Sequence, residues 1–566
     1  MRDDRQMEPS GGADAGSSGA GGVRGWHPLA ALTLLAGWLA TVGNVPLWSA
    51  VLRAQAALGW RGWVVTLAWG LALALVNLAV LAWLAAGPLR RPVGVALLAL
   101  AAVASYFMLA YGIVVDASMA ANVFQTDWRE ARDLLTPGLL VALVLGVALP
   151  GWLWWRLPVR RWPARRALLV RGGVGAAALA LAVALLWLSF QDLAALMRND
   201  RALRYLINPY NSVYAALRHG VGQRALASEP LQPIGLDVQP LPAAAREDEA
   251  PLVVLVVGET ARAANWGLNG YARDTTPRLR ALIQQGQPIV SFVAVTSCGT
   301  NTQTSVPCLF APEGRARWNP SRAQENLLDL LQRAGLAVTW LDNQSGCKGV
   351  CARVPSRQTD HLQVPGLCRG DECHDEILLR ELPGALQALP DAARRVGTLA
   401  VLHMMGSHGP AYFKRTPAGF KPFQPECTTA QLQACEPAHI VNAYDNTLRY
   451  TDHVLAELIG WLAQRRGPTA LLYVSDHGES LGEGGLYLHG MPYAVAPREQ
   501  KEVPMLLWAN DAMQRRLGLD WACLQRRAQE PASHDHVFHT VAGLFGVRSA
   551  VVDAGRDLLA ACRRAG

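Results

Sequence analysis

Five long apolar stretches without a charged residue dominate the first third of the chain. No Asp, Glu, Lys or Arg occurs between Arg24 and Arg53, Arg61 and Arg90, Arg91 and Asp116, Asp133 and Arg156, or Arg171 and Asp192. A helix needs about 20 apolar residues to cross a bilayer, and each stretch supplies that length. The sequence therefore predicts five membrane spans, at about residues 28–52, 62–87, 93–115, 135–155 and 172–191.

The charges in the loops set the expected orientation. Arg90 and Arg91 lie between spans two and three, and five arginines lie between spans four and five. Short basic loops stay on the cytoplasmic side, whereas the loop between spans three and four is acidic. We therefore expect a cytoplasmic N-terminus with a disordered tail over residues 1–25, and everything after about residue 190 on the outer side. The first apolar run is too long for a signal-peptide core, so we predict that it is an uncleaved anchor.

The overall charge excludes several classes of protein. Charged residues make up 17% of the chain, below the roughly 25% of soluble proteins, which argues against a soluble enzyme and a disordered chain. The net charge is +8, but only four of the 52 basic residues are lysines, and many arginines flank the apolar runs. We therefore expect no nucleic-acid partner. Because no charge lies in the middle of a span, the spans are predicted to form an anchor rather than a transporter.

All ten cysteines lie beyond residue 297, in the part predicted to be exported. An even number of cysteines on one side of a membrane is typical of disulfides in an oxidising compartment. A cysteine-ligated zinc site is the alternative, although the spacings do not repeat a CxxC pattern. Sequence alone does not fix the connectivity, and Cys523 and Cys562 receive no partner. Closeness in sequence suggests the pairs Cys298–Cys308, Cys347–Cys351, Cys368–Cys373 and Cys427–Cys435.

From residue 250 onward, apolar runs alternate with helical stretches. The runs at 251–258, 336–341, 397–402 and 470–474 are continuous, as in buried parallel strands, and helices are expected at 324–334 and 440–465. This alternation predicts an α/β domain over 250–566, with a mostly parallel sheet covered by helices on both faces. Residues 192–249 are predicted to be a bridge of helices and a Pro-rich linker, after a transmembrane anchor over 26–191.

Acids and histidines follow the ends of these strands. Glu259 comes directly after the first strand, His408 lies beyond the third, Asp476 and His477 follow the fourth, and His489 comes soon after. The carboxyl ends of parallel strands meet at one edge of a sheet. Carboxylate and imidazole together suit Zn²⁺, and Mn²⁺ less well.

A nucleophile is needed beside such a metal, and Thr300 is the candidate. Gly299 lets the backbone approach closely, and the polar run after it can open a helix whose N-terminus favours a bound phosphate. A threonine hydroxyl is a weak nucleophile until a metal lowers its pKa.

Six ordered motifs in the exported part, together with the five spans, resemble the lipid A phosphoethanolamine transferases. These enzymes include the mobile colistin-resistance proteins and belong to the alkaline phosphatase-like superfamily. The resemblance covers the chain apart from the N-terminal tail. The motifs are Val257-Gly-Glu-Thr-Ala-Arg262, Leu268-Asn-Gly-Tyr271, Thr296-Ser-Cys-Gly-Thr300, Ser305-Val-Pro-Cys308, Gly406-Ser-His-Gly-Pro410 and Ser475-Asp-His-Gly-Glu-Ser480.

The resemblance implies roles for particular residues. It implies one tightly bound Zn²⁺, with Thr300 as the phosphorylated nucleophile, and leaves open a second metal during turnover. It also implies that His408 and His489 contact the transferred group or that second metal, and that Lys348 contacts substrate. In the acidic outer loop it assigns Asn122, Thr126 and Glu130 to the phospholipid head group. The implied zinc ligands are Glu259, Thr300, Asp476 and His477.

The expected reaction has two half-reactions at the periplasmic side of a Gram-negative inner membrane. Phosphatidylethanolamine gives its head group to Thr300, and a lipid A phosphate then takes it, which would confer resistance to cationic peptides such as polymyxin. The oligomeric state stays open, with a monomer expected. The alternatives are transfer to a core-oligosaccharide sugar or a periplasmic glucan, glycerol-phosphate transfer, and a catalytically silent scaffold. A sulfatase is disfavoured, because the Thr300 segment lacks a C/S-x-P-x-R pattern.

Overall fold

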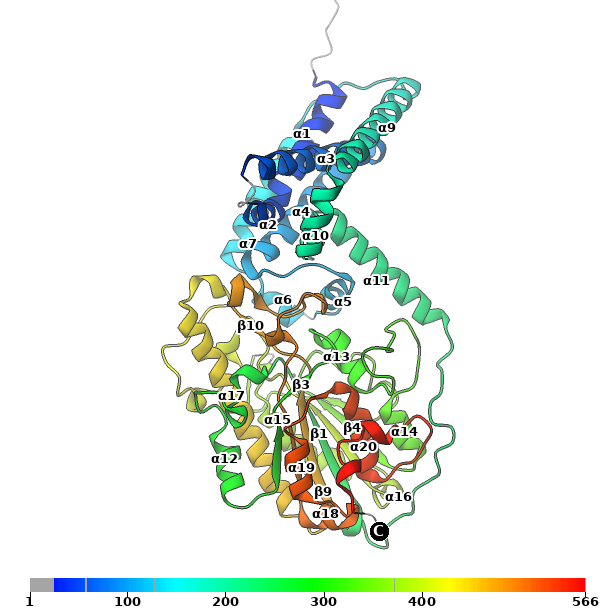
Figure 1. The fold of residues 1–566 in the computed structure, drawn as a ribbon, viewed down its shortest axis with the longest axis vertical. Coiled ribbons are helices and arrows are strands. Elements are labelled where there is room, and N and C mark those ends of the chain that lie inside the picture. The colour runs from blue at the N-terminus through cyan, green and yellow to red at the C-terminus, as the bar shows by residue number, and fades with distance from the viewer. Residues whose placement is uncertain (1–24, 56–58, 127, 201, 371, 565–566) are drawn as a thin grey trace, which may run out of the picture.

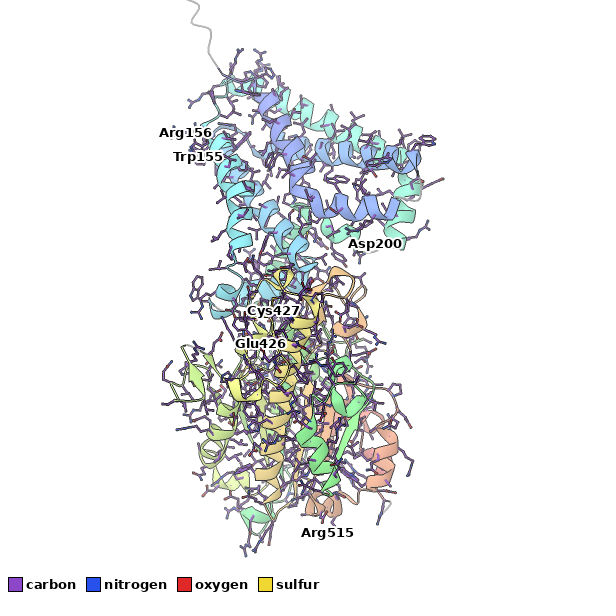
Figure 2. The ribbon with its side chains drawn as sticks, turned by 90° about the vertical axis from the view of Figure 1, so that its left-hand side faces the viewer. Trp155, Arg156, Asp200, Glu426, Cys427 and Arg515 are labelled. Atoms are coloured by element: carbon purple, nitrogen blue, oxygen red, sulfur yellow. A yellow bond between two sulfur atoms is a disulfide. The ribbon has the colours of Figure 1, made fainter. Side chains whose placement is uncertain are left out.

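The computed structural model describes residues 25–564 apart from 56–58, 127, 201 and 371. The predicted tail over 1–25 therefore lies outside the described residues, except for Gly25. Figure 1 shows a bundle of apolar helices at one end of the molecule and an α/β part at the other, with α5, α6 and α11 between them. Figure 2 places Trp155 and Arg156 on the helical part and Arg515 at the far end of the α/β part.

Five helices are long and apolar enough to cross a membrane, as the sequence predicts. The first is broken by a 3-10 turn between α1 and α2, and the fourth contains a π-helical turn next to Pro150 between α7 and α8. Proline donates no backbone hydrogen bond, which accounts for the local change of helix type. The helices are α1 (Pro28–Ala40), α2 (Val45–Gln55), α3 (Trp60–Leu84), α4 (Arg90–Tyr111), α7 (Pro137–Leu143), α8 (Leu149–Arg156) and α9 (Ala164–Leu188).

The fifth span begins eight residues before the predicted start. Its first two turns include Arg165, Arg166 and Arg171, whereas the predicted span begins only after the last of these charges. Long arginine side chains can reach past the end of a span while their backbone stays helical. Arg171 does so by donating to the carbonyl oxygen of Ala85 at 2.8 Å.

Two short helices, α5 (Ala117–Gln125) and α6 (Trp128–Asp133), form the predicted acidic outer loop. Asp116 begins α5 by accepting hydrogen bonds from the backbone N–H groups of Ser118 and Met119. An aspartate at this position satisfies N–H groups that have no partner within the helix. Asp127 of this loop lies outside the described residues.

The bridge consists of α10 (Phe190–Asn199) and α11 (Tyr210–Ser228), followed by an extended Pro-rich segment. This segment is attached to the α/β part by backbone hydrogen bonds from Gln232 to Ala323, Leu241 to Ala334 and Ala244 to Arg395.

Seven strands form one sheet in the order β2-β12-β9-β1-β8-β4-β5. β9, β1, β8, β4 and β5 run parallel, and β12 is antiparallel to both β9 and β2. The mostly parallel sheet predicted from the sequence is therefore confirmed. Its strands are β1 (Leu252–Gly258), β2 (Ile289–Phe292), β4 (Ala337–Asp342), β5 (Ser356–Gln358), β8 (Thr398–His403), β9 (Thr469–Ser475) and β12 (Met505–Ala509).

Alternate residues of the central strands pack into two separate cores. Val253, Leu255 and Val257 of β1 face one core with α13, α14, α18, α19 and α20, whereas Leu252 and Val254 face another with α12, α15 and α17. Both faces of the sheet are thus covered, which explains why its strands are continuously apolar. The helices are α12 (Pro277–Gln284), α13 (Thr302–Leu309), α14 (Leu327–Arg333), α15 (Glu376–Gln387), α16 (Asp391–Arg394), α17 (Pro437–Ala463), α18 (Asp511–Leu517), α19 (Trp521–Arg527) and α20 (Val537–Phe545).

Three strand pairs lie outside the main sheet. β3 (Val295–Thr296) pairs with β13 (Ala532–Ser533), β6 (Cys368–Arg369) with β7 (Glu372–Cys373), and β10 (Ser480–Leu481) with β11 (Tyr487–Leu488). The β10–β11 pair turns the chain back toward the end of β9, so that residues just beyond β11 return to the sheet edge.

All ten cysteines are paired in disulfides. Four pairs are those suggested by the sequence, Cys298–Cys308, Cys347–Cys351, Cys368–Cys373 and Cys427–Cys435. The fifth, Cys523–Cys562, ties α19 to the C-terminal segment and had no partner assigned from the sequence. The alternative of a cysteine-ligated zinc site is wrong, because every cysteine sulfur is bonded to another.

Candidate active site

The adjacent strands β1 and β9 place the first acids of the site side by side. Gly258 pairs with Ser475 in the sheet register, and the backbone N–H of Asp476 donates to the carbonyl oxygen of Gly258 at 2.9 Å. Glu259, Asp476 and His477 therefore leave the sheet at the same point. All three side chains are fully buried.

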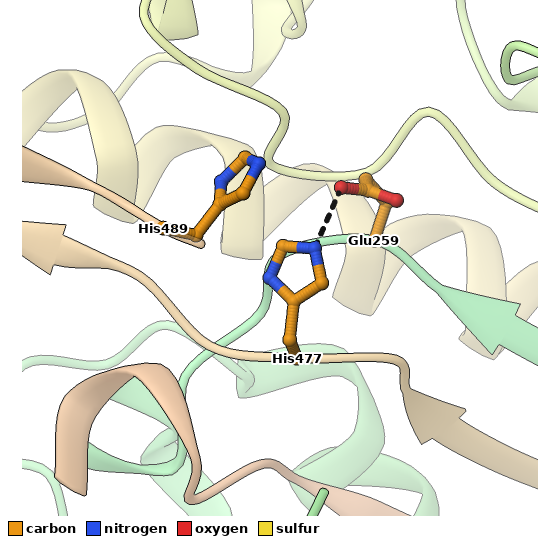
Figure 3. Close-up of side chains that lie close together, drawn as sticks. All are labelled: Glu259, His477 and His489. Carbon is orange, nitrogen blue, oxygen red and sulfur yellow. Dashed lines mark ion pairs between the residues drawn. The ribbon is translucent and has the colours of Figure 1, made fainter. Parts of the chain in front are cut away.

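Glu259, His477 and His489 form a cluster that could hold a metal ion (Figure 3). One potential ligand atom from each lies within 4.8 Å of the others. Nε2 of His477 is 3.4 Å from Oε1 of Glu259, and the imidazole rings of His477 and His489 are 4.3 Å apart. The turn after β11 supplies His489, which the sequence had assigned to the transferred group or a second metal.

The hydrogen bonds of His477 leave one ring nitrogen available. Its Nδ1 lies 2.9 Å from the carbonyl oxygen of Gly478, which accepts only from a protonated nitrogen. In the neutral imidazole, Nε2 then carries the lone pair, and it faces Oε1 of Glu259 and Oδ2 of Asp476, each at 3.4 Å. That Oδ2 atom is buried without a hydrogen-bond partner. An orphaned carboxylate oxygen beside an imidazole lone pair fits a divalent cation.

Burial and mutual charge perturb the protonation of these groups. Burial alone would raise the pKa of Glu259, but the hydrogen bond and charge of His477 hold it well below its usual range. Burial, and then the charge of Glu259, raise the pKa of Asp476 to about 7. Although burial opposes it, the carboxylates Asp476 and Glu259 raise the pKa of His477 to about 10. Groups with such divergent pKa values are typical of catalytic sites.

Thr300 lies against the segment that carries His489. Its carbonyl oxygen accepts from the N–H of Gly490 at 2.7 Å, and its hydroxyl donates to the carbonyl oxygen of Met491 at 2.6 Å. A Cβ at Gly299 would lie 2.8 Å from Cβ of Thr304, so glycine is needed for the tight approach to α13. The Asn301 side chain begins α13 by accepting from the N–H of Thr304. Thr300 therefore directly precedes a helix N-terminus, as predicted.

Two residues at the centre of the site, Thr302 and Gln344, carried no sequence signal, and a third, Glu479, lies in the Ser475–Ser480 motif without a predicted role. The Thr302 hydroxyl donates to Oε2 of Glu259 at 3.0 Å and lies 3.4 Å from Nε2 of His477. The Gln344 amide donates to the same carboxylate at 3.2 Å. Oε2 of Glu479 lies 3.0 Å from Nδ1 of His489, and burial raises the pKa of Glu479 to about 8.

The outer loop of the membrane part reaches His408. Its Nε2 lies 3.9 Å from Oε1 of Glu130, and its ring is 5.8 Å from that of His489. Arg415 donates to the carbonyl oxygen of His408 at 2.9 Å and pairs with Asp133 at 3.4 Å. Lys414 also pairs with Asp133. Glu130 and His408 are thus brought together at the contact between the two parts.

Asn122, Thr126 and Lys348 take part in hydrogen bonds outside this cluster. Thr126 donates to the carbonyl oxygen of Asn122 at the end of α5, and Lys348 donates to Ser345 at 2.8 Å. Within the described residues, no hydrogen bond or ion pair joins these three side chains to the histidines. Their assignment to substrate stays a prediction.

The sheet and the buried acid–histidine edge define a sulfatase-like domain, and a sulfatase family model matches residues 251–547. A model described as phosphoethanolamine transferase EptA/EptB matches residues 73–223. The chain is 41% identical to phosphoethanolamine transferase EptA of Escherichia coli K12 over 84% of this chain and 86% of that protein. It therefore belongs to the EptA family of phosphoethanolamine transferases, so it is an enzyme of the transferase class, as predicted.

Two solved structures are similar to this chain in sequence and fold. The integral membrane lipooligosaccharide phosphoethanolamine transferase A (EptA) of Neisseria meningitidis is 36% identical and superposes with a TM-score of 0.89, over 95% of this chain and 99% of that one. The C-terminal periplasmic domain of phosphoethanolamine transferase EptC from Campylobacter jejuni is 38% identical, with a TM-score of 0.51, over 60% of this chain and 100% of that one. The predicted combination of five apolar helices with an α/β domain is confirmed.

Proposed function

We propose that this chain transfers phosphoethanolamine from phosphatidylethanolamine to a phosphate of lipid A, using Thr300 as nucleophile and Zn²⁺ as metal. The observation that carries the proposal is the buried cluster of Glu259, Asp476, His477 and His489 next to the Thr300 segment. A buried anionic cluster with an unpartnered oxygen is costly unless a cation joins it.

The donor atoms favour zinc over the commoner hard cations. Glu259 and Asp476 offer carboxylate oxygens and His477 offers Nε2, a mixture that suits Zn²⁺, whereas Mg²⁺ and Ca²⁺ prefer oxygen ligands alone. When bound, the ion would lower the pKa of the Thr300 hydroxyl and neutralise charge on the phosphoryl oxygens. His489, 4.3 Å from the ring of His477, is the alternative third or fourth ligand.

The chain's own residues account for the two half-reactions. The Thr300 oxygen forms a bond to the phosphorus of phosphatidylethanolamine, and the bond to the diacylglycerol oxygen breaks. The proton that the Thr300 hydroxyl loses ends on the diacylglycerol oxygen, which leaves as a hydroxyl group. The nearby N-terminus of α13 favours the negative charge of the transferred group. An oxygen of a lipid A phosphate then attacks the same phosphorus and releases Thr300. Covalent catalysis thus lets two lipids react in turn without meeting each other.

His489 and His408 are suited to hold the transferred group. Burial, and then the charge of His477, lower the pKa of His489 to about 3, so that ring is neutral at working pH. His408 faces Glu130 of the outer loop, which offers a carboxylate to the ethanolamine ammonium. In this proposal, Asn122 and Thr126 contact the donor as it enters, and Lys348 contacts substrate.

We place the reaction at the periplasmic face of a Gram-negative inner membrane, with the N-terminus in the cytoplasm. Both substrates are lipids, which explains why the α/β domain is attached to five spans. Five disulfides are consistent with an oxidising compartment. An added ammonium next to an anionic phosphate would weaken the binding of cationic peptides such as polymyxin.

The test is mass spectrometry of lipid A from a Gram-negative host expressing the chain. Lipid A should gain one phosphoethanolamine unit with the wild type, none with Thr300→Ala, and a reduced amount with Thr300→Ser, which keeps the hydroxyl. Intact-protein mass should show the same unit on the wild type and not on Thr300→Ala.

Two results would contradict the proposal. Transfer that survives Thr300→Ala would reject the nucleophile. An unmodified lipid A, with the unit found on core oligosaccharide or periplasmic glucan instead, would reject the acceptor and favour the alternative acceptors.

A further inference from the structure

A cavity of about 890 Å³ lies between the membrane part and the α/β part, on the side of α11. One wall is α11 itself, which descends from the membrane helices toward the α/β part (Figure 1). The second wall is α5, and the third consists of the first turns of α13 and the loop 317–326. Lys348, predicted to contact substrate, lines this cavity, whereas the residues predicted for the metal, His408 and His489 do not.

The wall facing α11 carries two arginine side chains, Arg317 and Arg322. Arg317 and Arg322 are exposed, and within the described residues their side chains form no hydrogen bond or ion pair. The cavity is also lined by three acids, each with a partner of its own. Asp116 accepts from the backbone N–H groups of Ser118 and Met119, Glu325 pairs with Arg333 at 2.8 Å, and Glu313 accepts from Gln324 at 2.6 Å. The cavity therefore favours an anionic ligand.

The helix α5 lines this cavity with one face and carries a predicted donor contact on the next face. Ser118, Ala121 and Gln125, spaced along one face of α5, line the cavity. The neighbouring face carries Met119, which lies against Gly490 beside His489, and the predicted donor contact Asn122. Two ligands on neighbouring faces of α5 can therefore approach the same nucleophile.

The cavity reaches the helix that follows the nucleophile. Gln303 and Thr304, in the first turn of α13, line it, and Thr300 directly precedes that turn. Asn301 donates from its amide to the Ser118 hydroxyl at 3.2 Å, so α5 and the nucleophile segment are in contact at the inner end of the cavity.

An exposed apolar stripe runs along α11 beside the cavity. Tyr214, Leu217 and Val221 lie on one face of α11 and are all more than half exposed. Tyr214 belongs to both the stripe and the cavity lining. A charged cavity next to an apolar stripe matches an amphiphile with an anionic head and hydrocarbon chains.

We propose that this cavity binds the acceptor, an anionic glycolipid whose phosphorylated sugar head lies against Arg317 and Arg322 and whose acyl chains lie along Tyr214, Leu217 and Val221. This inference rests on the proposed function and adds the acceptor's position and its charged contacts. The donor is bound at the neighbouring face of α5. Arginine is well suited to the role, because its planar fork can bind two phosphate oxygens at once.

The test separates the two half-reactions in vesicles containing the full-length enzyme. With phosphatidylethanolamine alone, diacylglycerol release and the mass of the modified enzyme report the donor half-reaction. Lipid A added afterwards reports the acceptor half-reaction through loss of the enzyme adduct. The variant is Arg317→Gln with Arg322→Gln, and the matched control is Arg515→Gln, an exposed arginine at the opposite end of the molecule (Figure 2).

The double variant should form the adduct at the wild-type rate but pass it to lipid A at least about tenfold more slowly, with a higher KM for lipid A. Arg515→Gln should match the wild type in both steps. Equal slowing of both steps, or no slowing of the second, would overturn the proposed acceptor site. If the wild type formed no adduct and released no diacylglycerol, the proposed function itself would be wrong, and this inference would fall with it.

A deacylated phosphosugar distinguishes head-group binding from chain binding. The arginine variant should slow transfer to both the intact and the deacylated acceptor. Leu217→Ser with Val221→Ser should slow transfer to the intact lipid alone. Loss of transfer to both acceptors in the α11 variant would contradict the assignment of this stripe to the acyl chains.

Discussion

Asp133 holds the outer loop of the membrane part to the loop that carries His408, and Asp133→Asn tests whether this contact matters. Only 8% of Asp133 is exposed, and it pairs with both Lys414 and Arg415, which are 281 and 282 residues away in sequence. Arg415 in turn holds the carbonyl oxygen of His408 at 2.9 Å. Neutralising Asp133 should therefore loosen α6 from the α/β part.

The size of this effect depends on the interactions that Lys414 and Arg415 keep in Asp133→Asn. Removing one partner of a buried ion pair costs about 3–5 kcal/mol when the other charge is left alone. Arg415 keeps Glu372 at 3.2 Å, and the Lys414 side chain is 34% exposed, so both cations retain other stabilisation. We therefore expect a loss of about 2–3 kcal/mol, which corresponds to roughly 30- to 150-fold in the equilibrium between docked and undocked arrangements.

The assay compares a lipid donor with a soluble one. Release of diacylglycerol from phosphatidylethanolamine should fall by about tenfold or more in Asp133→Asn, whereas cleavage of a soluble phosphodiester of ethanolamine should fall by less than about threefold. Backbone amides of residues 406–415 should exchange hydrogen faster. The control is Lys421→Gln, which breaks an ion pair with Glu426 inside the α/β part. An equal fall for both substrates, or none for either, would refute the docking role.

Two further predictions concern the metal cluster and a buried carboxyl group. Removing divalent metal with a chelator should lower the melting temperature of the wild type, since a ligand at 1,000 times its Kd stabilises the folded state by about 4 kcal/mol. In Asp476→Asn the chelator should lower the melting temperature much less. If the chelator lowers it equally in both proteins, Asp476 is not a ligand. Burial raises the pKa of Asp452 to about 6, so the folded chain binds this proton more tightly than the unfolded chain does. Protonated Asp452 therefore adds about 3 kcal/mol at most to the free energy of unfolding. This contribution should be complete below about pH 4 and lost as the pH rises through 6. Asp452→Asn should flatten the melting temperature over this range, and an unchanged pH slope would refute the assignment.

Much of the fold follows from patterns that are strong in any single sequence. The strands predicted at 251–258 and 470–474 appear at Leu252–Gly258 and Thr469–Ser475, because a buried parallel strand must be apolar on both faces. The strands β2 and β12 were not predicted, since short apolar runs do not distinguish strand from helix. The fifth span starts eight residues before its predicted start, because its first two turns contain arginines and the prediction counts only the charge-free run.

The candidate site was predictable to the extent that it follows strand ends. Glu259, Asp476 and His477 meet because β1 and β9 are neighbours. Thr302 and Gln344 could not have been selected, because polar residues are common in both segments and only the tertiary fold aims them at Glu259. The pairing of Asp133 with Arg415 joins distant segments, and no local pattern predicts such a contact.

The packing of α5 against the nucleophile segment has a practical consequence for inhibitor discovery. Ser118 contacts Asn301, and Met119 lies against Gly490, so part of the wall around Thr300 comes from the membrane part. A compound selected against the exported half alone would meet a site with one side open, and groups grown into that opening would collide with α5 in the intact enzyme. Screening on the full chain in lipid would select for molecules shaped to the closed surface.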